Sequence, residues 1–556
     1  MGSSLCKPAE EYTCAAQSTV HECRFPLWAV KVSDFLQMSG PPEPHGVLQE
    51  RGLLHQWYPG MFLIFVSHQW LSINHPDPEG QQVRVLQEAL RSSISGALHV
   101  HEDLITWTDE RELSPKIRWH IAEGFLFFDW YAIPQITARK DGVNEEATKS
   151  DAALAVQSIP AYVELSNIFL ALVPELEHRD TAKTVNYATW LSRGWCRAEL
   201  WCRLLSNKQD TDVIVVYSSA EAEFMSPLDW QNNSIVEGDF TVESDRAVVV
   251  HLGEMAVDSK ISHLQESGPL SHYRFYAALR PKLMHQPCQG RSLEAFLGQF
   301  RFDSLEDAVQ ERTGMTAVMC ATFSGDEHML RLLAARRADV NHSLEGLNEL
   351  GYYDTQTVLM AATKSRQEPS VLATLVALRA DVNAKARTGL DALFMCRTPE
   401  HVKVLLECRV DMPNACLCGA AMFGGPDTIK LLLEKRCDPG DNTASSPLLS
   451  LAMNCRHNSK AVEIARMLIA HRGDVNAVEM IPEDMLWDCR KAQIQLAIFG
   501  WSLCKRLTRF AGSMPGLTPL GYAAIVGHTE LTRLFLDHGA ESMPNERGDL
   551  PEDLAR

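Results

Sequence analysis

The second half of the chain repeats one pattern of residues, and this repetition constrains the fold more than any other feature. Its clearest copy is "GLTPLGYAAIVGHTELTRLFLDHGA" at 516–540, in which a turn at Gly527 separates two apolar stretches. Five related units precede it, beginning at Gly314, Gln356, Thr388, Cys416 and Ser445. One such unit is too small to bury its own apolar face, so neighbouring copies must stack. The sequence therefore predicts an all-α solenoid over 314–556.

These units resemble ankyrin repeats. Each ends in an acidic residue, and successive ends are 42, 30, 27, 36 and 67 residues apart, around the ankyrin period of roughly 33 residues. The last gap is close to two periods, so we expect about six repeats with an insertion or a degenerate repeat near 478–515. Some positions depart from the ankyrin pattern, since Gly521 replaces the usual His, and Ala317 and Val358 replace the usual Pro. The resemblance implies a scaffold that binds protein partners.

The first half of the chain alternates short apolar runs with amphipathic segments. The helical segments are "EGQQVRVLQEALRSSI" (79–94) and "DAALAVQSIPAYVELS" (151–166), the second with a break expected at Pro160. The apolar runs are "MFLIFV" (61–66), "FLFFD" (125–129), "NIFLALV" (167–173) and "DVIVVY" (212–217). Such runs are typical of strands covered on both faces. The alternation predicts an α/β domain built on a parallel sheet.

Composition excludes several classes of protein. The formal charge is -19 with a pI near 5.5, and no basic stripe is visible, so a nucleic-acid partner is not expected. The fifteen cysteines are scattered without a CxxC pair, which predicts reduced thiols in a cytoplasmic protein, with no metal site and no disulfide framework. No apolar run approaches 18 residues, so no membrane span is expected.

Polar residues follow two of the predicted strands. Ser67, His68 and Trp70 come after the first strand, and Asp129 ends the second. Ligands of parallel sheets bind beyond the carboxyl ends of the strands, so these four residues are candidate ligand-binding residues. A Ser-His-Asp triad is disfavoured, because Ser67 and His68 are adjacent and their side chains point apart. The simpler alternative for His68 and Asp129 is hydrogen bonding at strand ends.

The segment "SRGWCRAELWCRLL" (192–205) predicts a largely buried helix that carries one carboxylate, Glu199. Two interpretations of Glu199 remain open. It can form an i,i+4 pair with Arg203, which contributes about 0.3 kcal/mol, or it can act in a cleft as a catalytic or ligand-binding group.

A resemblance to TIR domains bears on this choice. A strand ending in Phe-x-Ser, a second ending in Asp, a third strand and a helix with "WCRAEL" match the TIR pattern over about 55–217. The matching helix residues are Trp195, Cys196, Glu199 and Leu200. The resemblance implies a TIR/flavodoxin-like fold that can self-associate, and, in members that cleave NAD+, a catalytic Glu at the position of Glu199.

Cleavage of NAD+ passes through an oxocarbenium-like state whose leaving group is already cationic, so one carboxylate suffices. Either Trp195 or Trp70 could stack on a ring of the substrate. Two departures from the TIR pattern stand out. About 30 residues are inserted before "FLFFD", and a fifth strand is missing unless "RAVVV" (246–250) supplies it.

The expected organisation has four parts. An N-terminal extension (1–54) precedes the TIR-like α/β domain (55–217), and an acidic insertion with linking helices (218–313) leads to the ankyrin repeats (314–556). The first expected function is a signalling scaffold whose repeats recruit the α/β module to a protein partner. The alternative is an NAD+-cleaving hydrolase with Glu199 as the catalytic residue and NAD+ as substrate. No cofactor is expected.

Overall fold

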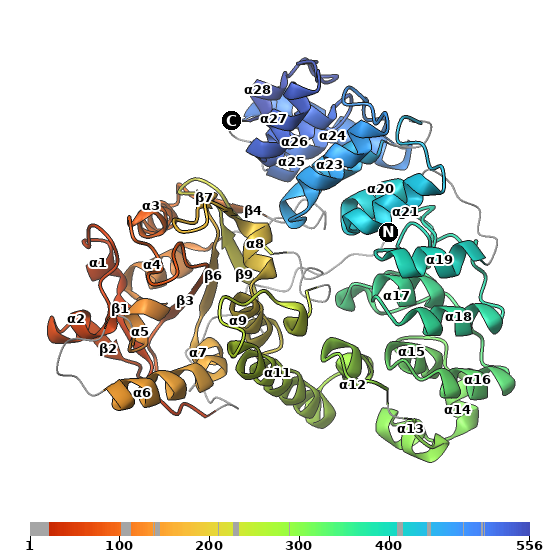
Figure 1. Ribbon diagram of the computed structural model, residues 1–556, viewed down its shortest axis with the longest axis horizontal. Helices are drawn as coiled ribbons and strands as arrows, with labels where there is room; N and C mark the ends of the chain where they lie inside the picture. The colour runs from red at the N-terminus through yellow and green to blue at the C-terminus, as the bar shows by residue number, and fades with distance from the viewer. Residues whose placement is uncertain are drawn as a thin grey trace. The chain divides into compact units, whose positions relative to one another are not determined.

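The computed structural model describes residues 22–101, 113–136, 138, 145–208, 211–225, 233–288, 290–407, 415–441, 446–481, 483–501, 504 and 506–555. The chain divides into two compact units (Figure 1). The first comprises Met1–Val100, Glu112–Asn186 and Ala198–Phe224, and the second comprises His101–Arg111, Tyr187–Arg197 and Met225–Arg556.

The first unit is built on a mixed sheet with four parallel strands at its centre. They are β3 (Leu63–His68), β5 (Phe125–Phe128), β6 (Ile168–Leu172) and β9 (Val213–Val216), in the order β5-β3-β6-β9. All four predicted strands are confirmed, and so is their parallel pairing. Nearly every residue in them is buried, which is why the sequence shows continuous apolar runs there.

Antiparallel strands extend this sheet beyond the predicted bounds. β1 (Trp28–Lys31) pairs with both β5 and β2 (Leu54–Gln56), and β10 (Ala222–Phe224) pairs with β9. With β4 (Val100–His101), the full order is β2-β1-β5-β3-β6-β9-β10-β4. The described part of the expected extension (1–54) therefore contributes a strand to the domain. The segment "RAVVV" does not supply the missing fifth strand, because 246–250 lies inside helix α11 (Asp245–Ser267).

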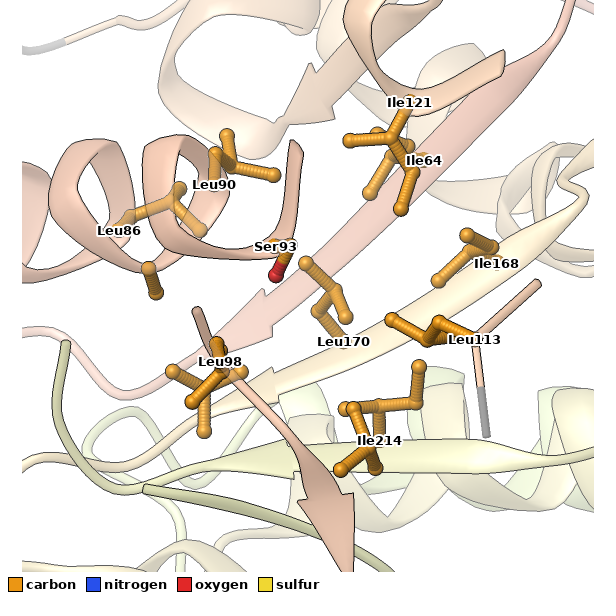
Figure 2. Close-up of a pocket in the computed structure, with 13 residues that line it drawn as sticks. Ile64, Leu86, Leu90, Ser93, Leu98, Leu113, Ile121, Ile168, Leu170 and Ile214 are labelled. Carbon is orange, nitrogen blue, oxygen red and sulfur yellow. The ribbon is translucent and has the colours of Figure 1, made fainter. Parts of the chain in front are cut away.

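Helices lie between the strands of this unit. Between β1 and β2 they are α1 (Val32–Phe35) and α2 (His45–Glu50), and between the parallel strands β3, β5 and β6 they are α3 (Gln81–Ser95), α4 (Pro115–Glu123), α5 (Asp129–Ala132), α6 (Glu145–Gln157) and α7 (Ile159–Leu165). The break expected at Pro160 lies between α6 and α7, where proline fits the first turn of the new helix. Figure 2 shows an aliphatic cavity between α3 and the sheet, lined by Leu86, Leu90 and Ile214 among others. It belongs to the apolar core and contains none of the candidate site residues.

Helix pairs follow one another through the second unit (Figure 1). The first helices of five repeats are α15 (Ala317–Phe323), α17 (Val358–Lys364), α20 (Ala415–Phe423), α22 (Pro447–Met453) and α26 (Pro519–Val526). Their second helices are α16 (Glu327–Ala335), α18 (Pro369–Ala377), α21 (Pro426–Glu434), α23 (Ala461–Ala470) and α27 (Thr529–Asp537). The unit beginning at Thr388 has only its second helix, α19 (Pro399–Glu407), because residues 392–395 form a turn instead. A short helix, α28 (Pro551–Leu554), ends the unit.

The segment near 478–515 forms two helices, α24 (Glu483–Phe499) and α25 (Arg506–Ser513), which pack on each other. α22 contacts α26 and α23 contacts α27, so the flanking repeats stack directly. The Asn476 side chain donates to the Gly539 carbonyl (3.2 Å) and accepts from the Glu541 amide (2.8 Å). Asn341 makes the same pair of bonds between the first two repeats. The two helices are therefore an insertion between stacked repeats, called the hairpin insertion below.

Further helices precede the repeats, namely α8 (Tyr187–Ser192), α11, α12 (Leu270–Leu283), α13 (Leu293–Phe300) and α14 (Leu305–Gln310). Phe275 of α12 is fully buried and packs against Phe323 and Tyr352 of the repeats. α12 thus covers the apolar end of the array, as a cap must. In the described part of the chain, no helix is long and apolar enough to cross a membrane.

Near the end of five of the second helices lies a residue with a left-handed backbone, and it is usually arginine rather than glycine. In the last repeat the position after the helix is Gly539, with φ at 84°, the left-handed conformation that glycine adopts without strain. Four other repeats place an exposed arginine there, with φ between 69° and 73°. They are Arg337, Arg379, Arg436 and Arg472.

Candidate functional site

The candidate residues meet at the carboxyl end of β3, on both faces of the sheet. Ser67 and His68 are the last two residues of that strand and are both buried. Successive side chains of a strand point to opposite faces, so Ser67 and His68 belong to two separate clusters. The prediction that their side chains point apart agrees with these separate partners, and a Ser-His-Asp triad does not form.

Ser67 contacts Glu199, which lies on helix α9 (Gly194–Leu204). The Ser67 hydroxyl donates to Oε2 of Glu199 at 2.5 Å. The two residues are 132 positions apart in the chain, so packing of α9 on the sheet brings them together. Taken as a whole residue, Glu199 is only partly buried.

Protein surrounds most of the Glu199 carboxyl group, and this burial raises its pKa to about 8. The Ser67 hydrogen bond acts in the opposite direction, and the negative charge of Asp129 adds to the rise. Glu199 is therefore mainly protonated at pH 7, and it becomes an anion only near pH 8. A carboxyl group with such a pKa can serve as a general acid or base near neutral pH.

On the other face, Asp129 joins His68 and Trp70. His68 Nε2 lies 2.9 Å from Oδ1 of Asp129, and Trp70 Nε1 donates to Oδ2 at 2.8 Å. The Trp130 amide also donates to Oδ1, at 2.6 Å. This arrangement fits the simpler prediction of hydrogen bonds at strand ends.

The charges of this pair stabilise each other. Burial alone would lower the pKa of His68, but the charge and hydrogen bond of Asp129 outweigh it, and the pKa is raised. Burial alone would raise the pKa of Asp129, but His68 and the hydrogen bonds from Trp70 and Trp130 lower it. Both shifts favour the charged forms, carboxylate on Asp129 and imidazolium on His68.

Asp77 was missed by the sequence interpretation. It is fully buried, and its carboxylate accepts from the amides of Gln81 and Val83 at the start of α3. Its charge also raises the pKa of His68. An Asp shortly before an amphipathic helix is a recognisable start signal, and that signal was available in "HPDPEGQQV".

Two other residues of the helical segment have polar partners different from those of Glu199. Trp195 belongs to the second unit, where its Nε1 donates to Oδ2 of Asp245 at 3.1 Å. Arg203 is buried and donates to the carbonyls of Ser166, Asn167 and Asp212. The polar contact described for Glu199 is the one with Ser67, so the alternative pairing of Glu199 with Arg203 is not found among the described contacts.

Among the described residues, no cluster of three or more His, Cys, Asp or Glu side chains could hold a metal ion. The described cysteines are free thiols, and most are buried. The closest described pair, Cys416 and Cys437, has its sulfur atoms 3.7 Å apart, too far for a disulfide bond.

Comparison with known proteins identifies the repeats. The ankyrin repeat family model matches residues 515–549. The ankyrin repeat domain of human ASB11 is similar to this chain at 19% identity, covering 42% of this chain and 90% of that one, with a TM-score of 0.29. The ankyrin repeat domain of Bcl-3, described as a member of the IkappaB family, is 21% identical, covering 42% and 92%, with a TM-score of 0.28. With its stacked helix pairs and the matched repeat at 515–549, the second unit of this chain contains a helical ankyrin-repeat region.

Proposed function

We propose that this chain is a protein-interaction scaffold, in which the ankyrin-repeat region binds a protein partner and recruits the N-terminal α/β unit to it. The observation that carries this proposal is the ankyrin-repeat region itself, because ankyrin repeats imply a role in binding proteins. The free thiols of the described cysteines support a cytoplasmic location for this scaffold.

The hairpin insertion is the surface that we assign to the partner. Within the described part of the chain, six of the fifteen exposed large apolar residues lie between 478 and 499. Trp487, Ile494 and Ile498 are 73%, 59% and 68% exposed, and their spacing of seven and four residues places them along one face of α24. Exposed apolar clusters of this kind mark protein-binding surfaces, and an apolar stripe on a helix suits an apolar groove of a partner.

The test compares two variants of the full chain in its own cells. Trp487→Glu with Ile494→Glu places charges on the α24 face, and Leu536→Glu places one on a 52% exposed apolar residue elsewhere in the array. We expect proximity labelling to lose a defined set of proteins with the first variant and to keep it with the second. Both variants should melt at the wild-type temperature. Identical labelled sets for both variants would contradict the assignment of this surface.

A second function, cleavage of NAD+, is favoured by the Ser67–Glu199 contact. The four parallel strands follow the order second, first, third, fourth along the chain, which is that of flavodoxin-like folds. In such folds ligands bind where the order reverses, which here is between β3 and β6, and Ser67 ends β3 at that point. This order supports the resemblance to TIR domains, and Glu199 would stabilise the oxocarbenium state as an anion.

The pKa of Glu199 gives this second function a distinctive signature. Since the anion forms only near pH 8, nicotinamide release from NAD+ should increase as the pH rises from 6 to 8. Glu199→Gln should abolish the release, whereas Arg203→Lys should keep it. Because TIR-like units can require self-association, the assay should include artificially clustered protein. Release that persists in Glu199→Gln, or no release under clustering, would refute the enzymatic function and leave the scaffold function standing.

A further inference from the structure

Two cysteines face each other in the fourth repeat, which begins at Cys416. Cys416 is the second residue of α20, and Cys437 lies three residues beyond the end of α21. Their sulfur atoms are 3.7 Å apart and share a hydrogen bond. The sulfur atoms of a disulfide bond are about 2 Å apart, so these two need to approach by only about 1.7 Å. The pair is reduced, but it lies close to the geometry of a disulfide bond.

Both cysteines lie near the ends of secondary-structure elements. Cys416 is in the first turn of α20, and Cys437 is in the segment that follows α21. Backbone near a helix end makes fewer intrahelical hydrogen bonds than backbone inside a helix, so it moves at a lower cost. A shift of about 1.7 Å, shared between the two side chains, is therefore compatible with the fold.

Other repeats have different residues at these two positions. The first repeat has Ala317 and Ala338, and the last has Pro519 and Ala540. The ankyrin fold therefore does not require cysteine at either position. Cysteine makes up 15 of the 556 residues, so its presence at both contacting positions of one repeat is rare by chance.

The two thiols differ in acidity and in exposure. Their hydrogen bond lowers the pKa of Cys437 against the effect of burial, and it raises the pKa of Cys416, as expected when the Cys416 thiol donates. By contrast, burial raises the pKa of Cys455 in the fifth repeat to about 12. Cys437 lies between the exposed residues Arg436 and Asp438 and is 5% exposed, whereas Cys416 is 1% exposed. Because the thiolate is the reactive form of cysteine, Cys437 is the member of the pair that a small reagent meets first.

We propose that Cys416 and Cys437 form an oxidation site that reacts with a hydroperoxide and closes to a disulfide bond. The Cys437 thiolate attacks one peroxide oxygen, the O–O bond breaks, and hydroxide or alkoxide leaves with the electron pair of that bond. Cys437 is then a sulfenic acid. The Cys416 thiol attacks the sulfur of this sulfenic acid, the S–O bond breaks, and the departing oxygen leaves as water with the thiol proton. Each sulfur atom loses one electron, and the peroxide gains two.

The disulfide bond joins the start of α20 to the segment after α21, across 21 positions of the chain. Such a cross-link limits how far the two helices of the repeat can separate. In a reducing compartment a disulfide of this kind is transient and responds to oxidants. The thiol pair is independent of the α24 surface, and it stands without the proposed scaffold function.

Treatment of the reduced full chain with hydrogen peroxide tests the proposal. The remaining thiols are alkylated, the protein is digested without reductant, and linked peptides are identified by mass spectrometry. We expect the link between Cys416 and Cys437 to be the main disulfide, to form at least tenfold faster than Cys455 is oxidised, and to disappear with dithiothreitol. Absence of this link after peroxide treatment would overturn the proposal, and so would an equal yield from the protein unfolded in urea.

Three alanine variants separate the roles of the two thiols. Both variants of the pair should fold, because the first repeat has alanine at the same positions. Cys416→Ala should stop at the sulfenic acid of Cys437, which dimedone traps, and Cys437→Ala should reduce the trapped product at least tenfold. Cys455→Ala removes a buried thiol outside the pair, and it should form the link at the wild-type rate. Trapping on Cys416 in Cys437→Ala at the level seen on Cys437, or slower linking in Cys455→Ala, would overturn the proposal.

Discussion

Replacement of Glu199 by glutamine should make the protein less sensitive to pH. The glutamine side chain has the same shape and can still accept the Ser67 hydrogen bond, but it cannot ionise. In the folded state burial raises the pKa of Glu199 from its ordinary value of 4.5 to about 8. Stability from this group is therefore fully present below pH 4.5 and is lost as the pH rises towards 8.

The magnitude follows from the size of this shift. Each pH unit between the two pKa values costs about 1.4 kcal/mol of unfolding free energy. Between pH 5 and pH 7, wild type should lose about 2.5 kcal/mol relative to Glu199→Gln, slightly less than two full units because pH 5 is still close to 4.5. The variant should consequently be the more stable protein at pH 7.

Urea unfolding of the full chain at pH 5, 6, 7 and 8 measures this difference, with tryptophan fluorescence as the signal. Glu88→Gln on the exposed face of α3 is the control, and its curve should run parallel to that of wild type. If Glu199→Gln also runs parallel to wild type over this range, the carboxyl group ionises freely in the folded protein, and the reasoning about its burial is wrong.

Three other changes have expected outcomes. A fragment of residues 268–556 should be about 3 kcal/mol more stable to urea than a fragment of residues 314–556, because only the longer one keeps Phe275 over the end of the array. Equal unfolding midpoints for the two fragments would contradict the capping role of α12. A disordered circular-dichroism spectrum from both fragments would contradict the solenoid. Arg203→Met should destabilise the full chain by about 3 kcal/mol in urea unfolding, because it leaves buried carbonyl groups without their donor; unchanged stability would show that water replaces the arginine. Replacing by glycine each arginine that has a left-handed backbone should raise the free energy of unfolding by about 1 kcal/mol per site. A variant with a lower calorimetric melting temperature than wild type would show that the arginine side chain stabilises the fold. These arginines are Arg337, Arg379, Arg436 and Arg472.

The central strands could be predicted because burial on both faces leaves a continuous apolar run in the sequence, as at Phe125–Phe128. The antiparallel strand β1 could not, because "WAVK" is four residues long and two of them are only partly buried. The run "RAVVV" is rich in β-branched residues, yet it lies in a long helix. Local preference for a strand is overridden there by the helix that surrounds it.

The candidate site was predictable in its location and not in its contacts. Parallel strands bring their carboxyl ends to one edge, so Ser67 and Asp129 could be placed there from the order of the elements. The partner of Glu199 depends on how α9 rotates against the sheet. Spacing along a helix predicts only neighbours within that helix, such as Arg203, whereas the observed contact is with Ser67. A contact between residues so far apart requires the tertiary packing to be known.

The hairpin insertion also has a consequence for how the array folds. The chain between α23 and α26 spans 48 residues, against 12 between α21 and α22. Closing a loop four times as long costs about 1 kcal/mol more in chain entropy, so the last repeat should join the growing stack after the others. Early pairing of α24 with α25 would shorten the effective loop. The order in which the repeats assemble therefore depends on the hairpin insertion, although its two helices are not themselves a stacked repeat.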